Sequence, residues 1–117
     1  MGNNIEKGKR GETISKEYLL SKGYIILDIN YRNKIGEIDI IALDKNKLVF
    51  IEVKTRTSIN FGYAYEAVNR KKQEKIIYCS YLYINQKKLM NYQPRYDIIE
   101  VYLTPNIRIN HIENSFC

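Results

Sequence analysis

The 117-residue sequence predicts an α/β fold, a mixed β-sheet flanked by helices in the order αβββαβ, with a short final strand. Two stretches have apolar residues at helical spacing, one near the N-terminus and one after Asn69. Between them lie three apolar segments, two of which alternate as β-strands do. Hairpin pairing would make these three strands an antiparallel meander. The second helix is long enough for a crossover, which favours parallel pairing of the strands on either side of it.

The first helix is expected over Gly11–Lys22, where Ile14 and Tyr18 follow a helical period and Gly23 is suited to end it. Five strands are expected, over Tyr24–Tyr31, Ile35–Leu43, Lys47–Arg56, Arg95–Leu103 and Ile107–Ile112. The segment Ser58–Glu66 is expected to be a loop.

Asn69 is a good N-cap for the second helix, which is expected to run to about Asn85. Its packing side is predicted to carry Ile76, Ile77, Ser80, Tyr81 and Ile84. Cys79 lies in the same helical pattern and is expected to be a small core residue.

Length and composition indicate a single domain over residues 1–117, long enough to bury a core without disulfides. No apolar run approaches the ~20 residues that a membrane span needs. Met1–Arg10 is polar and lacks the apolar core of a signal peptide. With Cys79, Cys117 and His111 as the only soft ligands, a zinc site is not expected. These features predict a cytoplasmic protein without a membrane partner, and they leave the oligomeric state open, a homodimer included.

The net charge of +6 indicates a polyanionic partner. This signal is weak by itself, because the abundant residues Ile, Lys, Asn and Tyr all have A/T-rich codons. The clustering is more informative. Basic residues gather before the first helix, before the second strand and at the start of the second helix, as Lys7, Lys9, Arg10, Arg32, Lys34, Arg70, Lys71, Lys72 and Lys75.

Two neighbouring strands carry acidic residues among apolar ones. Alternate residues of a strand share a face, so Asp39 shares one with Glu37 and Ile41, opposite Ile38. Glu52 and Lys54 share a face of the next strand. The polar stretch 44–47 between the two strands suits a tight turn. A hairpin closed there would bring Asp39 and Glu52 together, with Lys54 about 7 Å further along the same face, and we expect the group to lie at the edge of the sheet.

A sheet with one solvated face also alternates charged and apolar residues. Here both faces are rich in apolar residues, and buried charges are costly unless they are paired or bound to a metal. By itself the pattern is equally compatible with a functional site and with a structural ion pair. Glu37 is expected to pair with a nearby Lys or Arg. Asp97 is expected in a structural hydrogen bond or ion pair, with Arg95 or Arg56 as partner.

The ordered set of motifs resembles the PD-(D/E)xK nuclease superfamily, which implies a restriction-endonuclease-like fold. Within that superfamily it resembles the YraN-like family of small bacterial proteins, which are similar to archaeal Holliday-junction resolvases. The resemblance covers nearly the whole chain, from Gly8 to Phe116. It is carried by Gly11-Glu12, Asn30-Tyr31-Arg32, Gly36-Glu37-Ile38-Asp39, the segment Phe50–Arg56, Phe61-Gly62, Ala67-Val68, Lys72-Gln73, Tyr81-Leu82 and Arg95-Tyr96-Asp97. The usual Pro-Asp dipeptide is Ile38-Asp39 here, a mild departure because the chemistry needs the Asp.

The resemblance implies that Asp39 and Glu52, helped by the Val53 carbonyl, bind Mg²⁺ or Mn²⁺. Lys54 would hold or activate the attacking water, and Glu12 would reach in from the first helix as a third acid. Hard divalent cations do prefer carboxylate and carbonyl oxygens. Gln73 could orient a phosphate or the water, or it could be an ordinary polar residue at a helix start.

The resulting hypothesis is a metal-dependent endonuclease that hydrolyses phosphodiester bonds in branched or structured DNA. The chain lacks a dedicated base-reading module, so recognition of backbone and shape is expected. Phosphate contacts are predicted at Arg32, Lys34, Arg56 and Arg70, and stacking on unpaired bases at Tyr31, Phe61 and Tyr63. One alternative is a nucleic-acid-binding protein of the same fold with little or no cleavage. Another is a structural partner of a larger complex, in which ion pairs occupy the acidic cluster.

Overall fold

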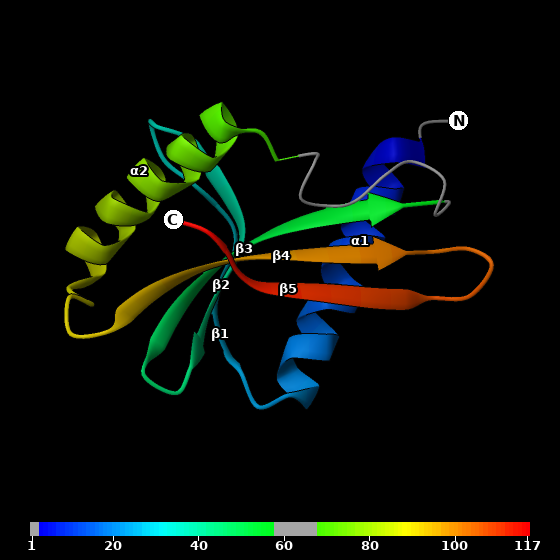
Figure 1. Ribbon diagram of the computed structural model, residues 1–117, viewed down its shortest axis with the longest axis horizontal. Helices are drawn as coiled ribbons and strands as arrows, with labels where there is room; N and C mark the ends of the chain where they lie inside the picture. Colours follow the sequence, from blue (N-terminus) through cyan, green and yellow to red (C-terminus); the bar gives the residue numbers. More distant parts are fainter. Residues whose placement is uncertain (1–2, 58–67) are drawn as a thin grey trace.

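The computed structural model describes residues 3–57 and 68–117, and it confirms the predicted α/β fold (Figure 1). The elements are α1 (Asn3–Ser21), β1 (Ile25–Arg32), β2 (Glu37–Asp44), β3 (Lys47–Arg56), α2 (Arg70–Lys87), β4 (Gln93–Tyr102) and β5 (Arg108–Phe116). The five strands form one mixed sheet in chain order. Neither helix, over the residues described, is long and apolar enough to cross a membrane.

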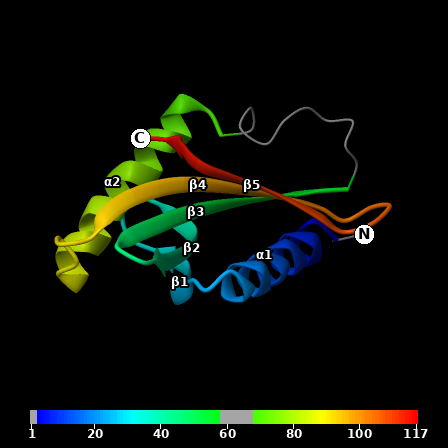
Figure 2. The same ribbon diagram turned by 60° about the horizontal axis from the view of Figure 1, so that its bottom comes forward.

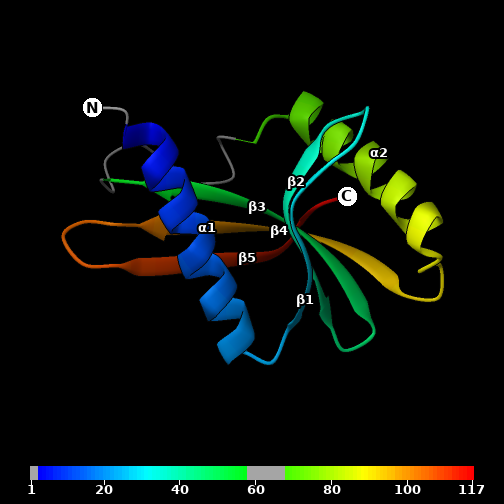
Figure 3. The ribbon, with the colours of Figure 1, turned by 180° about the vertical axis from the view of Figure 1, so that it is seen from behind.

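Strand pairing follows the predicted topology. β1, β2 and β3 form an antiparallel meander, β3 and β4 pair in parallel across the α2 crossover, and β4 and β5 are antiparallel. The two helices cover opposite faces of the sheet, which separates them in the view of Figure 2. The same arrangement is seen from behind in Figure 3, where α1 lies across the sheet.

The β2–β3 hairpin closes through the predicted tight turn. Asp44 and Lys47 are the last paired residues, so only Lys45 and Asn46 lie between the strands. Lys45 has φ of 56°, in the left-handed region that two-residue hairpin turns require. This closure fixes the β2–β3 register and therefore the relative positions of the acidic residues further along both strands.

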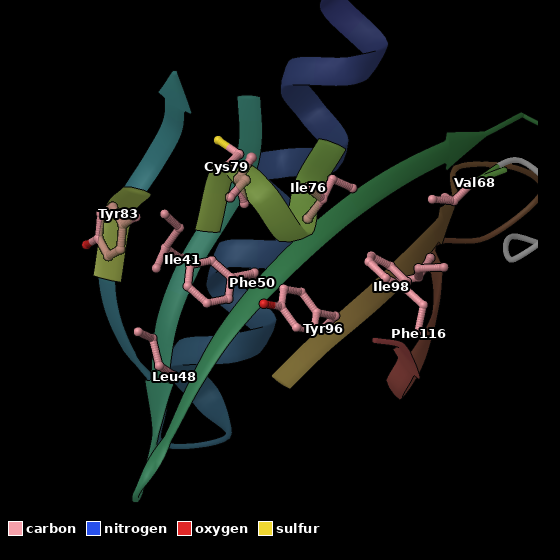
Figure 4. Close-up of a cluster of buried hydrophobic side chains, with 11 residues drawn as sticks. Ile41, Leu48, Phe50, Val68, Ile76, Cys79, Tyr83, Tyr96, Ile98 and Phe116 are labelled. Atoms are coloured by element: carbon pink, nitrogen blue, oxygen red, sulfur yellow. The ribbon is translucent and has the colours of Figure 1, made fainter. Parts of the chain in front are cut away.

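The face of the sheet under α2 contains a core built around aromatic rings (Figure 4). The Phe50 ring stacks on Tyr96 at 5.5 Å between centroids and meets Tyr83 edge-on at 6.1 Å. From α2, the buried residues are Ile76, Cys79, Ser80 and Tyr83. Cys79 is thus a core residue as predicted. The prediction that Tyr81 packs inward is wrong, because the buried stripe at i, i+3, i+4 and i+7 passes through Tyr83 and leaves Tyr81 half exposed.

The opposite face packs against α1 through Leu19, Ile40, Val49 and Ile51. A Cβ at Gly11 would overlap the Thr55 side chain of β3, so the helix can lie this close to the sheet only because residue 11 has no side chain.

The α1 helix ends at Ser21, two residues before a glycine that closes its last turn. Gly23 adopts φ of 92°, and its N–H donates to the Leu20 carbonyl, as expected for a C-terminal glycine.

The largest extensions beyond the predicted bounds are those of α1 and β5. α1 begins at Asn3 and not at Gly11, because each added helical residue gains a backbone hydrogen bond once the helix is formed, even without apolar periodicity. β5 continues past Ile112 to Phe116. A β-bulge shifts its pairing with β4, and Asn114 has φ of 52°. This shift interrupts the alternation of inward and outward residues that marks a strand in the sequence.

Candidate active site

The candidate site lies where β2 and β3 separate. Their ladder ends at the pair Ile40–Ile51. One residue further, the Asp39 carboxylate accepts a hydrogen bond from the Val53 backbone N–H at 2.8 Å. The side chain thus occupies the opening between the strands and is anchored to the β3 backbone. β2 and β3 are interior strands, so the expectation of a site at the sheet edge is wrong; strand divergence creates the opening instead.

In β2, side chains stop alternating strictly between the two faces of the sheet at this point. Ile38 and Ile41 both pack in the core under α2, whereas Ile40 packs in the core under α1. The predicted grouping, with Ile38 opposite Ile41, is therefore wrong. Beyond Ile40 the strand pairs only with β1, so β3 no longer fixes its pleat. This departure allows Asp39 to reach the Val53 N–H.

Glu52 is the most buried acidic residue at the opening, with a side chain only 6% exposed. Two lysines neutralise it. The Lys54 Nζ lies 3.6 Å from its carboxylate and the Lys72 Nζ lies 2.7 Å from it. Lys54 comes from β3, two residues along the same face, and Lys72 comes from the first turn of α2. A buried carboxylate held between two ammonium groups is compensated electrostatically.

These residues line one pocket of about 460 Å³. Glu12 reaches it from α1, together with Lys7 and Gly8. The remaining lining comes from Asp39, Glu52, Val53, Lys54, Thr55, Thr57 and Lys72. The structure therefore brings Glu12, Asp39, Glu52 and Lys54 into the lining of one pocket.

The pKa of Asp39 is raised from its ordinary value to about 7. Burial is the largest cause, and repulsion from the Glu52 carboxylate adds to it. The Val53 N–H opposes the rise by stabilising the ionised form. Near neutral pH, Asp39 is therefore divided between a carboxylate and a protonated acid that hydrogen-bonds Glu52.

Two other groups respond to the same crowding. Burial, with smaller contributions from Glu37 and Glu52, raises the pKa of Glu12, although a hydrogen bond with Asn30 offsets part of the rise. Burial alone would lower the pKa of Lys72, but its bond to Glu52 outweighs this, and the net shift is upward. The pocket accordingly stabilises added positive charge.

This donor set fits a hard divalent cation. Glu52 is close enough to raise the pKa of Asp39, and crowded carboxylates of this kind are stabilised by a bound cation. Across residues 3–57 and 68–117, no three Asp, Glu, His or Cys side chains are grouped closely enough to ligate one ion. The ligands would thus be two carboxylates completed by backbone oxygen, such as the Val53 carbonyl, and by water.

Lys72 is the site residue that the sequence interpretation did not assign. Gln73, which it did assign, does not line the pocket; its side-chain amide donates to the Val68 carbonyl at 2.9 Å. Lys72 and Ile76 are four residues apart, so both lie on the inward side of α2. The sequence did contain a signal for this choice. Asn69 as N-cap and Ile76 on the packing side fix which side of α2 faces the sheet, and that side includes Lys72 and not Gln73.

The predicted phosphate-contact residues lie outside this pocket, and three of the four have acidic partners. Arg32 pairs with Glu37 at 3.2 Å and Arg70 with Glu74 at 3.6 Å, both at the surface. Lys34 is exposed in the turn before β2. Arg56 is largely buried and faces Glu100 at 3.7 Å.

The predicted stacking residues divide into two groups. Tyr31 packs edge-on against Tyr83 at 4.9 Å between ring centroids and donates its hydroxyl to Gln86. Phe61 and Tyr63, with the predicted loop Ser58–Glu66, lie outside the described residues.

Asp97 belongs to a separate, structural network. Its carboxylate accepts two hydrogen bonds from Arg95, at 3.0 and 2.9 Å, and one from the Asn114 backbone N–H at 3.0 Å. His111 Nε2 lies 2.7 Å from it. The predicted pairing with Arg95 is confirmed, as is the pairing of Glu37 with a nearby arginine.

The fold and the pocket define a small α/β protein in which one sheet and both helices contribute acids and lysines to a single opening. The chain belongs to the family described as "Uncharacterised protein family UPF0102", whose model matches residues 11–101. A UPF0102 protein of Caldanaerobacter subterraneus subsp. tengcongensis is 54% identical over 113 residues, covering 93% of each chain. One from Clostridioides difficile is 54% identical over 114 residues, covering 97% of this chain and 99% of the relative. The matched range includes every acid and lysine of the pocket except Lys7.

Proposed function

We propose that this protein is a metal-dependent endonuclease of the PD-(D/E)xK type, which hydrolyses phosphodiester bonds in DNA. The observation that carries the proposal is the convergence of Asp39, Glu52 and Lys54 where β2 and β3 separate, with Glu12 entering the same pocket from α1. A structural ion pair would account for Glu52 and its lysines. It does not account for Asp39, whose neighbour in the pocket is another acid.

Asp39, Glu52 and the Val53 carbonyl would hold Mg²⁺ or Mn²⁺. When bound, such a cation neutralises charge on the phosphate and lowers the pKa of a water ligand. The hydrogen bond from the Val53 N–H keeps the Asp39 carboxylate oriented before any ligand arrives. This preorganisation favours binding, because little side-chain freedom is lost.

The chain's other charged groups complete the chemistry. The Lys54 ammonium would stabilise negative charge developing on the phosphate oxygens. Lys72 would be released from Glu52 as the acid acquires a new cationic partner, and it could then contact the substrate. Glu12, with its raised pKa, could hold or accept a proton from a water molecule in the pocket.

Structured or branched DNA is the proposed substrate class. The support is the resemblance to archaeal Holliday-junction resolvases.

A second candidate function is binding of nucleic acid with little or no cleavage. The observation that favours it is the pair of lysines on Glu52. In that case Lys54 and Lys72 would be permanent partners of the acid, and the pocket would have low affinity for divalent cations.

A metal-binding and cleavage experiment tests the proposal. Isothermal titration with Mn²⁺, and nicking of linear, flapped and four-way DNA with Mg²⁺ or Mn²⁺, would be measured for the wild type, Asp39→Asn and Glu52→Gln. We expect metal binding and EDTA-sensitive cleavage in the wild type and loss of both in each variant. A wild type that binds DNA but neither binds Mn²⁺ nor cleaves any substrate would establish the second candidate instead.

A further inference from the structure

A second groove adjoins the acidic pocket. It has a volume of about 420 Å³ and lies between the first turns of α2 and the turn that leads into β2. Lys71, Lys72 and Lys75 line it from the helix, Gly36 lines it from the turn, and Glu37 lines it from the start of β2. We call this feature the lysine groove.

The lysine groove and the acidic pocket meet at Lys72, which lines both. The Lys72 ammonium lies 2.7 Å from Glu52. A chain that passes through the acidic pocket and continues past Lys72 therefore enters the lysine groove. Two adjoining cavities of this size suit a linear polymer better than a single small anion.

The charge distribution in α2 is unfavourable for helix stability alone. Arg70, Lys71 and Lys72 fill its first three positions, and the first turn has no acidic residue. The helix dipole disfavours cations at this end. Lys71 and Lys75 are also four residues apart, a spacing at which like charges repel. Such local conflicts with stability are characteristic of functional surfaces.

The two lysines are also free to contact a ligand. Lys71 and Lys75 are exposed, and neither forms an ion pair with another residue in the part of the chain that the structure describes. Glu37 is the one acid among the described residues that line the groove, and it pairs with Arg32 at 3.2 Å, which compensates its charge.

We propose that the lysine groove binds backbone phosphates of the DNA strand next to the phosphate that is cleaved, with Lys71 and Lys75 as the contacts. The proposal rests on the proposed function, because it takes DNA as the ligand and the acidic pocket as the place of cleavage. It assigns the path of the strand to the α2 side of the opening, away from Arg56, whose charge faces Glu100.

The test compares Lys71→Gln/Lys75→Gln with a charge-matched control, Lys22→Gln/Lys87→Gln. The control lysines are exposed and lie near the C-terminal ends of the two helices. Affinity for single-stranded and duplex DNA would be measured by fluorescence anisotropy in EDTA over a range of salt concentrations. Inorganic phosphate would serve as a competitor, and thermal melting would confirm that both variants fold.

We expect Lys71→Gln/Lys75→Gln to bind DNA several-fold more weakly, with a salt dependence shallower by roughly 1–2 units of slope. The control variant should keep more of the wild-type DNA affinity and more of the wild-type salt dependence. In cleavage assays the groove variant should raise KM and keep kcat at saturating DNA. Equal behaviour of the two variants would overturn the groove assignment even if the wild type cleaves DNA.

The experiment separates the groove from the catalytic proposal. If the wild type binds DNA without cleaving it, while the groove variant alone loses affinity, the groove stands and the endonuclease proposal fails. If inorganic phosphate saturates the groove and displaces DNA as effectively as unlabelled DNA does, the site binds small anions and the strand assignment is wrong.

Discussion

At the scale of single residues, two aspartates of the same sheet show how partners decide the behaviour of a carboxylate. Burial raises the proton affinity of both. At Asp97, bonds from His111, Arg95 and the Asn114 N–H reverse this effect and lower the pKa. At Asp39, the nearby Glu52 reinforces it, and the pKa rises to about 7. Ionised Asp97 therefore stabilises the fold, whereas Asp39 stabilises the fold less when it is ionised than when it is protonated.

The first prediction concerns Asp39→Asn. Between the ordinary pKa of 3.8 and the folded value of about 7, the folded protein holds a proton that the unfolded chain has released. Stability contributed by this group therefore falls as pH rises through that range, by up to roughly 1.4 kcal/mol per pH unit. Asparagine removes the titration. In urea unfolding from about pH 5 to about pH 8, Asp39→Asn should gain stability over the wild type as pH rises.

Added Mn²⁺ supplies the control. At about pH 8 it should raise the unfolding midpoint of the wild type, because a ligand that binds only the folded state stabilises it. The same addition should leave Asp39→Asn nearly unchanged. If Asp39→Asn is instead strongly destabilised at every pH, the carboxylate is a structural partner and the catalytic assignment is wrong.

The second prediction separates rate from affinity at Lys54. Its side chain is 23% exposed and lies on the same face as Glu52. If it stabilises the transition state, Lys54→Ala should reduce cleavage by roughly 10²–10⁴-fold, while DNA binding, spread over many phosphates, falls much less. Single-turnover cleavage and anisotropy measure the two effects. Equal losses would make Lys54 a phosphate anchor, and a loss of stability alone would make it the structural partner of Glu52.

At the scale of elements, α1 is positioned by a close approach to β3. Gly11 faces Thr55, and the next residue, Glu12, enters the acidic pocket. The position of the helix therefore determines how far the third acid reaches. A side chain at residue 11 would move the helix away from the sheet and move Glu12 with it.

The third prediction compares Gly11→Ala with Gly8→Ala, two substitutions in the same helix. A methyl group at residue 11 would overlap Thr55, whereas one at residue 8 meets nothing within 4 Å. Alanine favours a helix by about 1 kcal/mol over glycine. Gly8→Ala should therefore stabilise the protein by up to about 1 kcal/mol, and Gly11→Ala should destabilise it by roughly 1–3 kcal/mol. Urea unfolding of both variants measures the difference, and equal stabilities would show that α1 adjusts freely.

Elements set by local chemistry could be predicted from the sequence. Apolar patterning and turn residues predicted each described helix and strand. The Asn69 side chain caps α2 by accepting a hydrogen bond from the Lys72 N–H at 2.9 Å, and polar residues form the β2–β3 turn. Features that depend on other elements could not be predicted. The start of α1 has no apolar signal, and the end of β5 follows a bulge.

The same distinction applies to the candidate site. Asp39 and Glu52 could be paired from hairpin register, since the turn fixes which residues meet. Lys72 could not be placed in this way, because its position depends on how α2 rests on the sheet. Arg56 is a predicted phosphate contact, but its Nε lies 3.7 Å from the carboxylate of buried Glu100 in β4.

At the scale of the whole molecule, two charged systems lie in different parts of the sheet. The acidic pocket opens where β2 and β3 diverge, and Lys72 reaches it from the α2 side. The Asp97 network involves β4 and β5, and it reaches α1 through the hydroxyl of Tyr18, which lies 3.0 Å from His111 Nδ1. The protein thus combines a site whose acids repel one another with a network whose charges are matched.

The last prediction uses this contrast. Asp97 is fully buried and accepts hydrogen bonds from Arg95 and Asn114 as well as contacting His111. Asp97→Asn would leave the nearly buried Arg95 guanidinium without its main counter-charge, and breaking a buried pair costs roughly 3–5 kcal/mol. Asp44→Asn is the matched control, because Asp44 also bonds Arg95, at 2.9 Å, but is 30% exposed; it should cost roughly 1 kcal/mol.

The destabilisation caused by Asp97→Asn should depend on pH. The lowered pKa of Asp97 contributes stability that is present above the unfolded value of 3.8 and is lost as pH falls through the folded value. The difference in unfolding free energy between the wild type and Asp97→Asn should therefore be largest near neutral pH and should shrink under acid conditions. The Asp39→Asn difference should change in the opposite direction over its own range, growing in favour of the variant as pH rises. Urea unfolding of both variants across pH measures this, and parallel pH profiles would mean that the two aspartates are not electrostatically distinct.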